Sequence, residues 1–403
     1  MLINFGIKNM TSFKDEAILS LSAYNRLSRH KEAVCERNGK SFLKTIIIYG
    51  PNASGKSNLL QSLALLINLI VGRANPEPQN HRMIYYPFLL STQTEKKPVE
   101  FFIEFVLEDK FFRYEISLDD KEIFFEQLKQ QIKAKEEILF LRKKSNLEII
   151  NEKIFLEGIK IRQLDVLNKA IPVLSLSSYL NGEISKSILS FFKKMRMSLM
   201  PCFLYTSDMD ARIKDNAYRM RIEKFLQAAD LSISSLSYRE IPEGESKRIS
   251  PRFEHCVYDE EHKLVRKRLF ASFRESRGTL GYLKLLPLIL DVLEKGGVFL
   301  ADELEASLHP LLVEQIIKLF NSEHNKRAQL IFTSHNTTFL TKRLFRKDQI
   351  YFVEKNPYGE SHLFSLLDYI QNAREDENWE TRYLGGMYGA LPSLKSLERI
   401  YNK

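Results

Sequence analysis

The sequence predicts an α/β protein built around a parallel core sheet. Three short apolar segments, at 45–49, 298–301 and 330–333, have the length and composition of buried strands. An amphipathic helical pattern over 312–320 separates the second strand from the third. Parallel strands need crossover connections and are covered on both faces, so apolar strands separated by helices favour this fold class.

The N-terminal region predicts a strand and then a strand–turn–helix unit. Ile3, Phe5 and Ile7 alternate with other residues, which is the period of a half-buried strand. The apolar strand at 45–49 ends at a Gly-Pro turn, and leucines and isoleucines recur at helical spacing from Ser57 onward. We therefore expect a helix to begin directly after the turn.

An antiparallel side sheet is expected next to the core. Apolar residues alternate over 101–107 and again over 112–118, and the residues between them form a turn of the hairpin type. The stretch 120–150 is rich in Lys and Glu, but its apolar residues do not keep a heptad repeat. A long coiled coil is therefore excluded there.

A helical insertion is expected in the middle of the chain. Helical spacing of apolar residues returns at 184–192 and at 222–229. We divide the chain into an N-terminal lobe at 1–160, a helical insertion at 161–250 and a C-terminal lobe at 251–403.

The composition excludes several classes of protein. Among 403 residues, 44% are hydrophobic and 28% charged, which excludes a wholly disordered or fibrous chain. Three cysteines are too few for a disulfide framework, and the longest apolar stretch, 59–71, is too short and too polar to span a bilayer. No secretory signal pattern opens the sequence, so we expect a cytoplasmic protein without a membrane partner. The net charge of +9 permits nucleic-acid binding without requiring it.

The strongest signal is a phosphate-binding loop between the strand at 45–49 and the helix after it. It matches G-x-x-x-x-G-K-[ST] at every fixed position. Glycines allow backbone N–H groups to wrap around phosphate oxygens, the lysine adds a charge, and the serine hydroxyl can bind Mg²⁺. The expected cofactor-binding residues are Gly50, Pro51, Asn52, Ala53, Ser54, Gly55, Lys56, Ser57 and Asn58.

A pair of carboxylates follows the strand at 298–301. Asp302 is expected to bind Mg²⁺ together with Ser57, and Glu303 to act as the general base for an attacking water. This is the Walker B arrangement of phosphate-loop ATPases. The alternative for the pair is a solvated acidic turn.

Two further features can each be interpreted either as part of a phosphate site or as purely structural. His335 follows the apolar strand at 330–333, where its imidazole can reach a γ-phosphate or serve a purely structural role. Ser276 and Gly278 form a Ser-x-Gly turn before a helical pattern, which can bind an anion or simply cap the helix.

The order of these motifs resembles the heads of ATP-binding-cassette (ABC-type) ATPases. It is most similar to the RecF- and SMC-like group, and closest to RloA-like stand-alone ATPases of bacterial phage-defence loci. The resemblance covers about 1–120 and 265–395 of the sequence. The segments that carry it are 275–279, 302–310, 329–335, 348–355 and 383–392.

The resemblance implies a P-loop ABC-type ATPase head that binds ATP and Mg²⁺ and forms a homodimer across its nucleotide sites, or a higher oligomer. Ser276 and Gly278 would be the signature motif that contacts the γ-phosphate held by the other subunit, and His335 the switch histidine. Residues 307–310 would lie at the dimer interface. The sequence departs from the transporter form of the signature, because Arg277 occupies its variable position.

The function implied is that of an ATPase that senses or regulates in an anti-phage defence system and acts with a separate effector such as a nuclease. The alternatives are a RecF/SMC-like DNA-binding repair ATPase and a weakly hydrolysing, nucleotide-bound scaffold.

Several weaker features of the sequence each allow two interpretations. The basic runs at 193–196 and 266–268 suit nucleic acid or a solvated face, and the cluster of His255, Cys256 and His262 is a poor zinc set. Gln79 and Gln93 are the candidates for a Q-loop glutamine.

Overall fold

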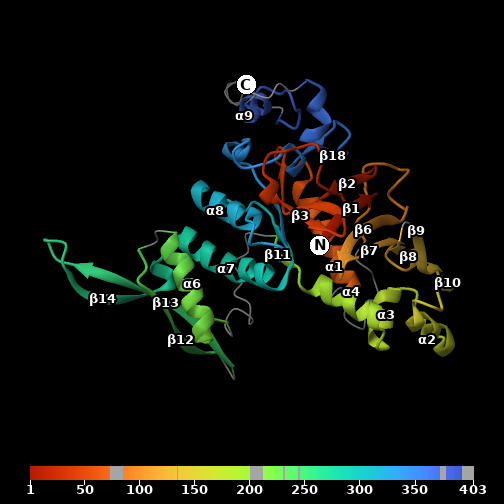
Figure 1. Cartoon of the computed structure of the whole chain (residues 1–403), viewed down its shortest axis with the longest axis horizontal. Coiled ribbons are helices and arrows are strands. Elements are labelled where there is room, and N and C mark those ends of the chain that lie inside the picture. Colours follow the sequence, from red (N-terminus) through yellow and green to blue (C-terminus); the bar gives the residue numbers. More distant parts are fainter. Residues whose placement is uncertain are drawn as a thin grey trace.

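The computed structural model describes residues 1–72, 85–133, 135–199, 212–229, 232–243, 246–372 and 378–392. Figure 1 shows a central body and an arm that projects from it. Gln79 lies outside the described residues, as does the acidic run at 375–377, for which the sequence favours an exposed turn over a metal site. Within the described part of the chain, no helix is both long and apolar enough to cross a membrane.

The core is a six-stranded sheet, and all but one of its neighbouring pairs are parallel. This confirms the α/β fold class with a parallel core sheet. The last strand runs antiparallel to its neighbour. The strand order is β11 (Arg196–Ser198), β15 (Gly297–Ala301), β16 (Ala328–Thr333), β5 (Thr45–Tyr49), β17 (Ile350–Lys355) and β18 (Ser361–Ser365).

Helices cover both faces of this sheet, because alternate residues of each buried strand point to opposite sides. In β5, Ile46 and Ile48 join the apolar cluster that contains helix α1 (Lys56–Ile70). Ile47 and Tyr49 join the second cluster, which contains α7 (Arg277–Lys295) and α8 (Pro310–Asn321).

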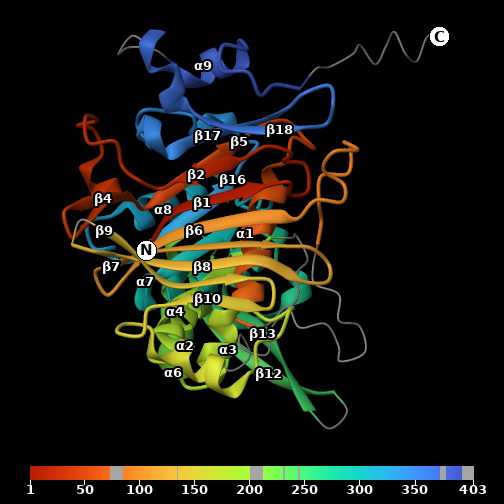
Figure 2. The same ribbon diagram turned by 90° about the vertical axis from the view of Figure 1, so that its right-hand side faces the viewer.

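The expected side sheet is present and is larger than the hairpin that predicted it. Its seven strands are antiparallel throughout, and the predicted turn joins Leu107 to Lys110. Figure 2 shows these strands stacked beside the core. Their order is β10 (Asn146–Ile150), β9 (Lys135–Lys143), β8 (Ile123–Ile132), β7 (Lys110–Leu118), β6 (Val99–Leu107), β1 (Leu2–Lys8) and β2 (Ala17–Ser20).

Smaller elements complete the body. A two-stranded ribbon consists of β3 (Val34–Arg37) and β4 (Lys40–Leu43), and the last described helix is α9 (Trp379–Leu384). Short 3₁₀ helices lie at Lys31–Ala33, Ser272–Arg274, Thr337–Phe339, Lys347–Gln349 and Leu366–Asn372.

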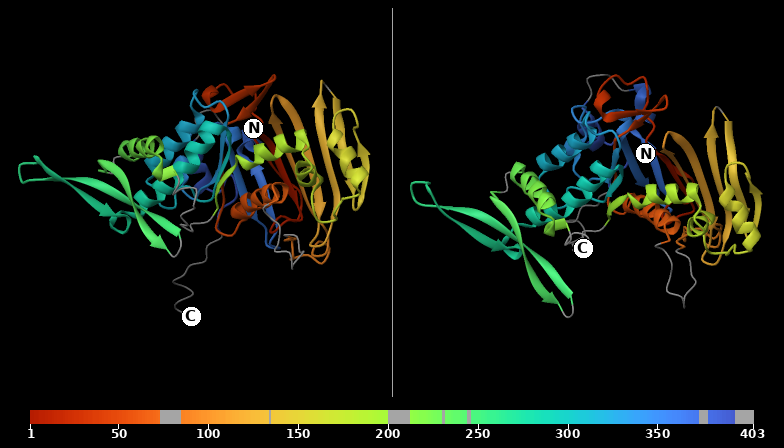
Figure 3. Two further views of the ribbon diagram at one scale, coloured as in Figure 1. Left: turned by 90° about the horizontal axis from the view of Figure 1, so that it is seen from below. Right: turned by 60° about the horizontal axis from the view of Figure 1, so that its bottom comes forward.

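The prediction that 161–250 is a helical insertion is wrong for its last part. Helices α2 (Leu156–Leu164), α3 (Val173–Tyr179), α4 (Glu183–Lys193) and α6 (Asn216–Ala228) are present. They are followed by a three-stranded antiparallel sheet of β12 (Ser235–Glu243), β13 (Ser246–Tyr258) and β14 (Leu264–Ala271). We call α6 and this sheet the arm; Figure 3 shows it extending away from the body.

The arm forms a sheet because its apolar residues recur with period two. Leu236, Ile249 and Phe253 all point to one face of the sheet and are buried in the same cluster as Ile222 and Leu226 of α6. This alternation is visible in the sequence, but the helical spacing just before it is the stronger signal. The division of the chain into two lobes and an insertion stays a prediction.

A fully buried ion pair joins the side sheet to the helices beneath it. Arg142 and Glu126 both have fully buried side chains, with Nη1 of Arg142 3.5 Å from Oε2 of Glu126. Glu126 also accepts hydrogen bonds from the backbone N–H groups of Val173 and Leu174 at the start of α3. Burial raises the pKa of Glu126, and Arg142 and these donors oppose that shift.

Replacing Arg142 should therefore destabilise the fold strongly. In Arg142→Met, the Glu126 carboxylate stays buried without its cation, and removing one partner of a buried pair costs about 3–5 kcal/mol. Denaturant unfolding measures the change. Lys143→Ala is the control, because its pair with Glu148 is exposed and should contribute under about 1 kcal/mol. Equal stability of the two variants would contradict the assignment.

Candidate nucleotide-binding site

Three parallel strands end at the same edge of the core sheet, and each is followed by one of the predicted motifs. Thr333 of β16 lies opposite Ile48 of β5, and Phe332 lies opposite Ala301 of β15. The phosphate loop, the Asp302–Glu303 pair and His335 therefore leave the sheet side by side. This edge, at the carboxyl ends of the strands, is where ligands bind in open α/β sheets.

The backbone of the phosphate loop takes conformations that its glycines permit. Gly55 has a φ of 118°, and a Cβ there would lie 2.5 Å from the Ser361 hydroxyl. Gly50 has a φ of 153°, and a Cβ there would lie 2.2 Å from the Val353 carbonyl oxygen. Glycine is required at both positions because the backbone of β17 and the start of β18 pack directly against the loop.

Two serines outside the motif support the loop. Ser361 donates a hydrogen bond to the Ser54 carbonyl at 2.5 Å, and Asn58 donates to the Ser12 hydroxyl at 2.8 Å. The Ser361 N–H also donates to the Ser12 carbonyl. The sequence analysis missed both serines, since neither belongs to a pattern and only the tertiary structure brings them to the loop.

Lys56 points back into its own loop. Its ammonium donates to the carbonyls of Gly50 and Pro51, at 2.9 and 3.1 Å, and the residue is 5% exposed. Burial lowers the pKa of Lys56, and the nearby carboxylates of Asp302, Glu303 and Glu305 oppose the shift. The loop thus holds a buried cation close to the acidic residues of the neighbouring strand end.

The residues present fit a nucleotide with its metal ion. The Ser54 hydroxyl is buried without a hydrogen-bond partner among the described residues, so it has a donor to offer a ligand. Backbone N–H groups at the start of α1 and the Lys56 ammonium suit a polyphosphate. Ser57 and Asp302 supply the oxygen ligands that Mg²⁺ prefers.

The Thr333 hydroxyl joins the end of β16 to the acidic pair. It donates to Asp302 at 2.6 Å and accepts from the Glu303 N–H at 2.7 Å. Glu303 has a φ of 49°, an uncommon conformation for a non-glycine residue, and its side chain is 51% exposed. The His335 Nε2 lies 3.6 Å from its carboxylate. Thr333 therefore holds the Asp302 carboxylate and the backbone of Glu303, a role that the sequence analysis did not assign.

Glu305 holds the segment that carries His335. One of its carboxylate oxygens accepts hydrogen bonds from the Ser334 hydroxyl at 2.8 Å, the His335 N–H at 2.6 Å and the Asn336 N–H at 3.3 Å. Its other oxygen is buried without a partner among the described residues. The sequence analysis missed this residue, although its place two residues after Glu303 was a signal.

Ser276 and Gly278 lie at the start of α7. The Ser276 hydroxyl accepts from the Thr279 N–H at 3.0 Å, which makes it the N-cap of the helix. A Cβ at Gly278 would lie 3.0 Å from the Ser307 carbonyl oxygen, so α7 packs on the segment after the acidic pair. Within the described residues, no hydrogen bond joins Ser276 or Gly278 to the phosphate loop of its own chain.

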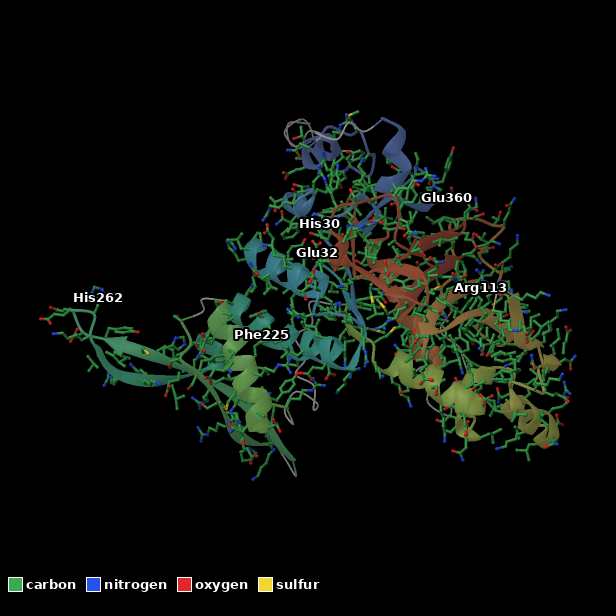
Figure 4. The ribbon with its side chains drawn as sticks, viewed as in Figure 1. His30, Glu32, Arg113, Phe225, His262 and Glu360 are labelled. Carbon is green, nitrogen blue, oxygen red and sulfur yellow. The ribbon has the colours of Figure 1, made fainter. Side chains whose placement is uncertain are left out.

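The His and Cys residues at 255–262 do not form a metal site among the described residues. Gln93 is exposed in a turn, and no group of three His, Cys, Asp or Glu residues in the described ranges could hold a metal ion. His255 instead bonds Glu275 at 2.9 Å. His262 lies at the tip of the arm, far from the other labelled residues in Figure 4.

Comparison with known proteins identifies the family. A family profile described as "AAA domain, putative AbiEii toxin, Type IV TA system" matches residues 46–341, well over half of the chain. The chain belongs to this family. It therefore contains an ATP-binding domain of the AAA ATPase type, in agreement with the phosphate loop. No curated protein matches the sequence.

Solved structures that match this chain include three SMC heads. The SMC head domain from Thermotoga maritima is 14% identical with a TM-score of 0.40, and the match covers 90% of this chain and 98% of that chain. An SMC head bound to the C-terminal winged-helix domain of ScpA is 16% identical, with 92% and 99% covered and a TM-score of 0.43. A Pyrococcus furiosus SMC head, bound to the C-terminal domain of ScpA, is 15% identical with a TM-score of 0.39. The match covers 92% of this chain and 99% of that chain.

Lys56→Ala should weaken ATP binding. It removes a charge-assisted contact worth about 1.5–3 kcal/mol, which corresponds to a loss of about tenfold or more in affinity. Calorimetric titration with ATP measures the change. Lys44→Ala is a matched control, because Lys44 is also buried and bonded to backbone carbonyls but precedes β5 instead of following it. If Lys56→Ala binds ATP as the unaltered chain does, this loop is not the phosphate site.

Glu305→Ala should loosen the segment after β16. The His335 N–H loses its acceptor, and the Asn336 N–H keeps only the Ser334 hydroxyl. Hydrogen bonds to a charged group contribute about 1.5–3 kcal/mol. We expect faster amide hydrogen exchange in the peptide that covers 334–337. The exchange rate should change less elsewhere in the core. Glu303→Ala is the control, since its half-exposed carboxylate accepts no hydrogen bond from these amides. Unchanged exchange in Glu305→Ala would contradict the positioning role.

Proposed function

We propose that this chain is an ATP-hydrolysing ABC-type ATPase of the RecF/SMC-like group, closest to RloA-like ATPases. The observation that carries the proposal is the meeting of four side chains from three strand ends: Lys56, Asp302, Glu303 and His335. A cation for the phosphates, a metal ligand, a base and a polar imidazole are the set that hydrolysis of a phosphoanhydride needs.

Each residue has a distinct task in this proposal. The Lys56 ammonium leaves the carbonyls of Gly50 and Pro51 and pairs with the β- and γ-phosphates. Asp302 and Ser57 hold Mg²⁺, which neutralises developing charge on the phosphates when bound. Glu303 accepts a proton from the attacking water. His335, 3.6 Å from Glu303, donates a hydrogen bond to the γ-phosphate.

We further propose that two chains share each site as a homodimer. Ser276 and Arg277 are exposed at the N-terminus of α7, and the 19-residue helix directs its positive end outward. Ser276 and Gly278 have no bond to the loop of their own chain in the described residues, so they are available to the γ-phosphate held by a second chain. ATP would then close two heads face to face, and hydrolysis would reopen them.

We propose a cytoplasmic role in anti-phage defence, in which head closure controls a separate effector such as a nuclease. The motif resemblance and the family description, "putative AbiEii toxin, Type IV TA system", support this role. A second candidate is a DNA-binding repair ATPase, which the exposed basic run Arg266, Lys267 and Arg268 favours. Measuring ATP hydrolysis with and without duplex DNA separates the two.

The decisive variant is Glu303→Gln, which keeps the size of the side chain and removes the base. We expect ATP binding to persist and turnover to fall by about 10²–10⁴, the usual contribution of a general base. Phosphate release by the purified protein measures turnover. Glu323→Gln is the control, because Glu323 is exposed and follows α8 at the opposite edge of the sheet. Hydrolysis at the unaltered rate in Glu303→Gln would refute the assignment of the base.

The same pair of variants tests the biological role in cells. When the protein is expressed with its neighbouring genes and the cells are challenged with phage, Glu303→Gln should change plaque formation and Glu323→Gln should not. If phage plating is the same for both variants and for cells without the genes, the defence role fails even where the ATPase assignment holds.

A further inference from the structure

The C-terminal segment 378–390 packs against the edge of the core sheet that carries the candidate site. Figure 2 shows α9, which lies in this segment, above β17 and β18. Tyr383 and Tyr388 are buried in the same apolar cluster as Tyr49, the last residue of β5. Part of the sequence resemblance, 383–392, falls in this segment, yet the site residues predicted from the sequence all lie outside it.

Hydrogen bonds fix this segment on the end of β17. The Ala390 N–H donates to Oε2 of Glu354 at 3.2 Å, and the Tyr383 hydroxyl donates to the Ala390 carbonyl at 2.9 Å. Gly389 has a φ of 65°, and a Cβ there would lie 2.7 Å from the same Glu354 oxygen, so this close approach needs glycine. The segment therefore has a defined position relative to the core sheet.

Glu380 of this segment bonds a residue that follows His335. Its carboxylate accepts a hydrogen bond from the Thr337 hydroxyl at 2.7 Å. Hydrogen bonds to a charged acceptor are shorter and stronger than neutral ones. The C-terminal segment is thus attached to the chain two residues after the imidazole.

Tyr49 bonds the same stretch of chain from the end of β5. It is 1% exposed, and its hydroxyl donates to the Asn336 carbonyl at 3.0 Å. Its ring lies 5.9 Å from the Tyr383 ring and 6.2 Å from the Phe352 ring, between centroids. Burial raises the pKa of the Tyr49 hydroxyl well above its ordinary value, and the nearby Glu305 carboxylate adds to the shift. The hydroxyl therefore stays protonated and remains a hydrogen-bond donor at neutral pH.

We propose that Tyr49 and Glu380 are positioning residues that hold His335 for the γ-phosphate, which makes the segment 378–390 part of the ATP site. This inference rests on the proposed hydrolytic function. Neither residue touches the nucleotide in this arrangement, and both act through the backbone that carries the imidazole.

Three separate parts of the chain hold this short backbone stretch. Glu305 accepts from the His335 and Asn336 N–H groups, Tyr49 donates to the carbonyl that follows, and Glu380 accepts from the hydroxyl after that. The His335 side chain is 37% exposed, so its position depends largely on how its backbone is held. A misplacement of about 1 Å in a group that meets the reacting atoms can cost about a hundredfold in rate.

Tyr49 also connects the two halves of the site. Gly50, the first residue of the phosphate loop, follows it directly, while its hydroxyl bonds the residue after His335. One rigid aromatic side chain therefore sets the spacing between the phosphate loop and the histidine.

The test removes single hydroxyl groups or their bonds and measures both turnover and ATP binding. Tyr49→Phe should lower kcat for ATP hydrolysis about two- to tenfold, the usual contribution of one neutral hydrogen bond. Thr337→Val removes the charge-assisted bond to Glu380 and should lower kcat about tenfold or more, and Thr337→Ser should recover it. Calorimetric titration should give an unaltered Kd for ATP in each variant, because the phosphate loop itself is unchanged.

Tyr351→Phe is the matched control. Tyr351 is a buried tyrosine of β17 whose hydroxyl also donates to a backbone carbonyl, that of Ser20 at 3.1 Å, but it belongs to the apolar cluster on the other face of the core sheet. This variant should keep the unaltered kcat. Without nucleotide, amide hydrogen exchange over 334–337 should be faster in Tyr49→Phe and unchanged in Tyr351→Phe.

The outcomes separate this inference from the proposed function. An unaltered kcat in Tyr49→Phe and Thr337→Val, where Glu303→Gln does lower turnover, would overturn the positioning role and leave the ATPase proposal intact. An equal loss of turnover in Tyr351→Phe would assign the effect to the stability of the core and also overturn it. If Glu303→Gln hydrolyses ATP at the unaltered rate, the proposed function fails, and the exchange rate over 334–337 still decides whether Tyr49 holds this stretch.

Discussion

Strand β16 lies between the strands that carry the two halves of the candidate site, and hydrogen bonds on both sides keep it there. It pairs in parallel with β5, which leads into the phosphate loop, and with β15, which leads into Asp302 and Glu303. At its end, the Thr333 hydroxyl bonds both acidic residues. A displacement of β16 would therefore change the position of the acids, of His335 and of the loop together.

The site also depends on a buried lysine ammonium and several carboxylates that lie near one another where water has little access. Burial disfavours the charged form of Lys56, and three carboxylates nearby oppose that effect. Glu305 carries part of this negative charge while it fixes the backbone of His335. Among the described residues, one oxygen of Glu305 and the hydroxyl of Ser54 are buried without a hydrogen-bond partner, so the contacts described do not satisfy every polar group of the site.

The arm differs from the body in how it is stabilised. The body has apolar clusters on both faces of its core sheet, and a buried Arg142–Glu126 pair joins its side sheet to α3. Among the described residues of the arm, the part that packs on α6 has a buried face, whereas residues 264–269 of β14 are exposed. The His255–Glu275 contact connects these two regions next to the predicted signature motif.

The sequence by itself predicted the parallel core, which the structure confirms, and it proposed the main site residues. Buried strands read as apolar runs, and phosphate chemistry demands particular residues at fixed spacing, as in Gly50–Ser57. Both signals are local. Only the tertiary structure revealed the roles of Thr333, Glu305, Ser12 and Ser361, because their contacts join segments far apart in the chain. It also decided that 235–258 is a sheet, since strand pairing depends on which face a neighbouring helix covers.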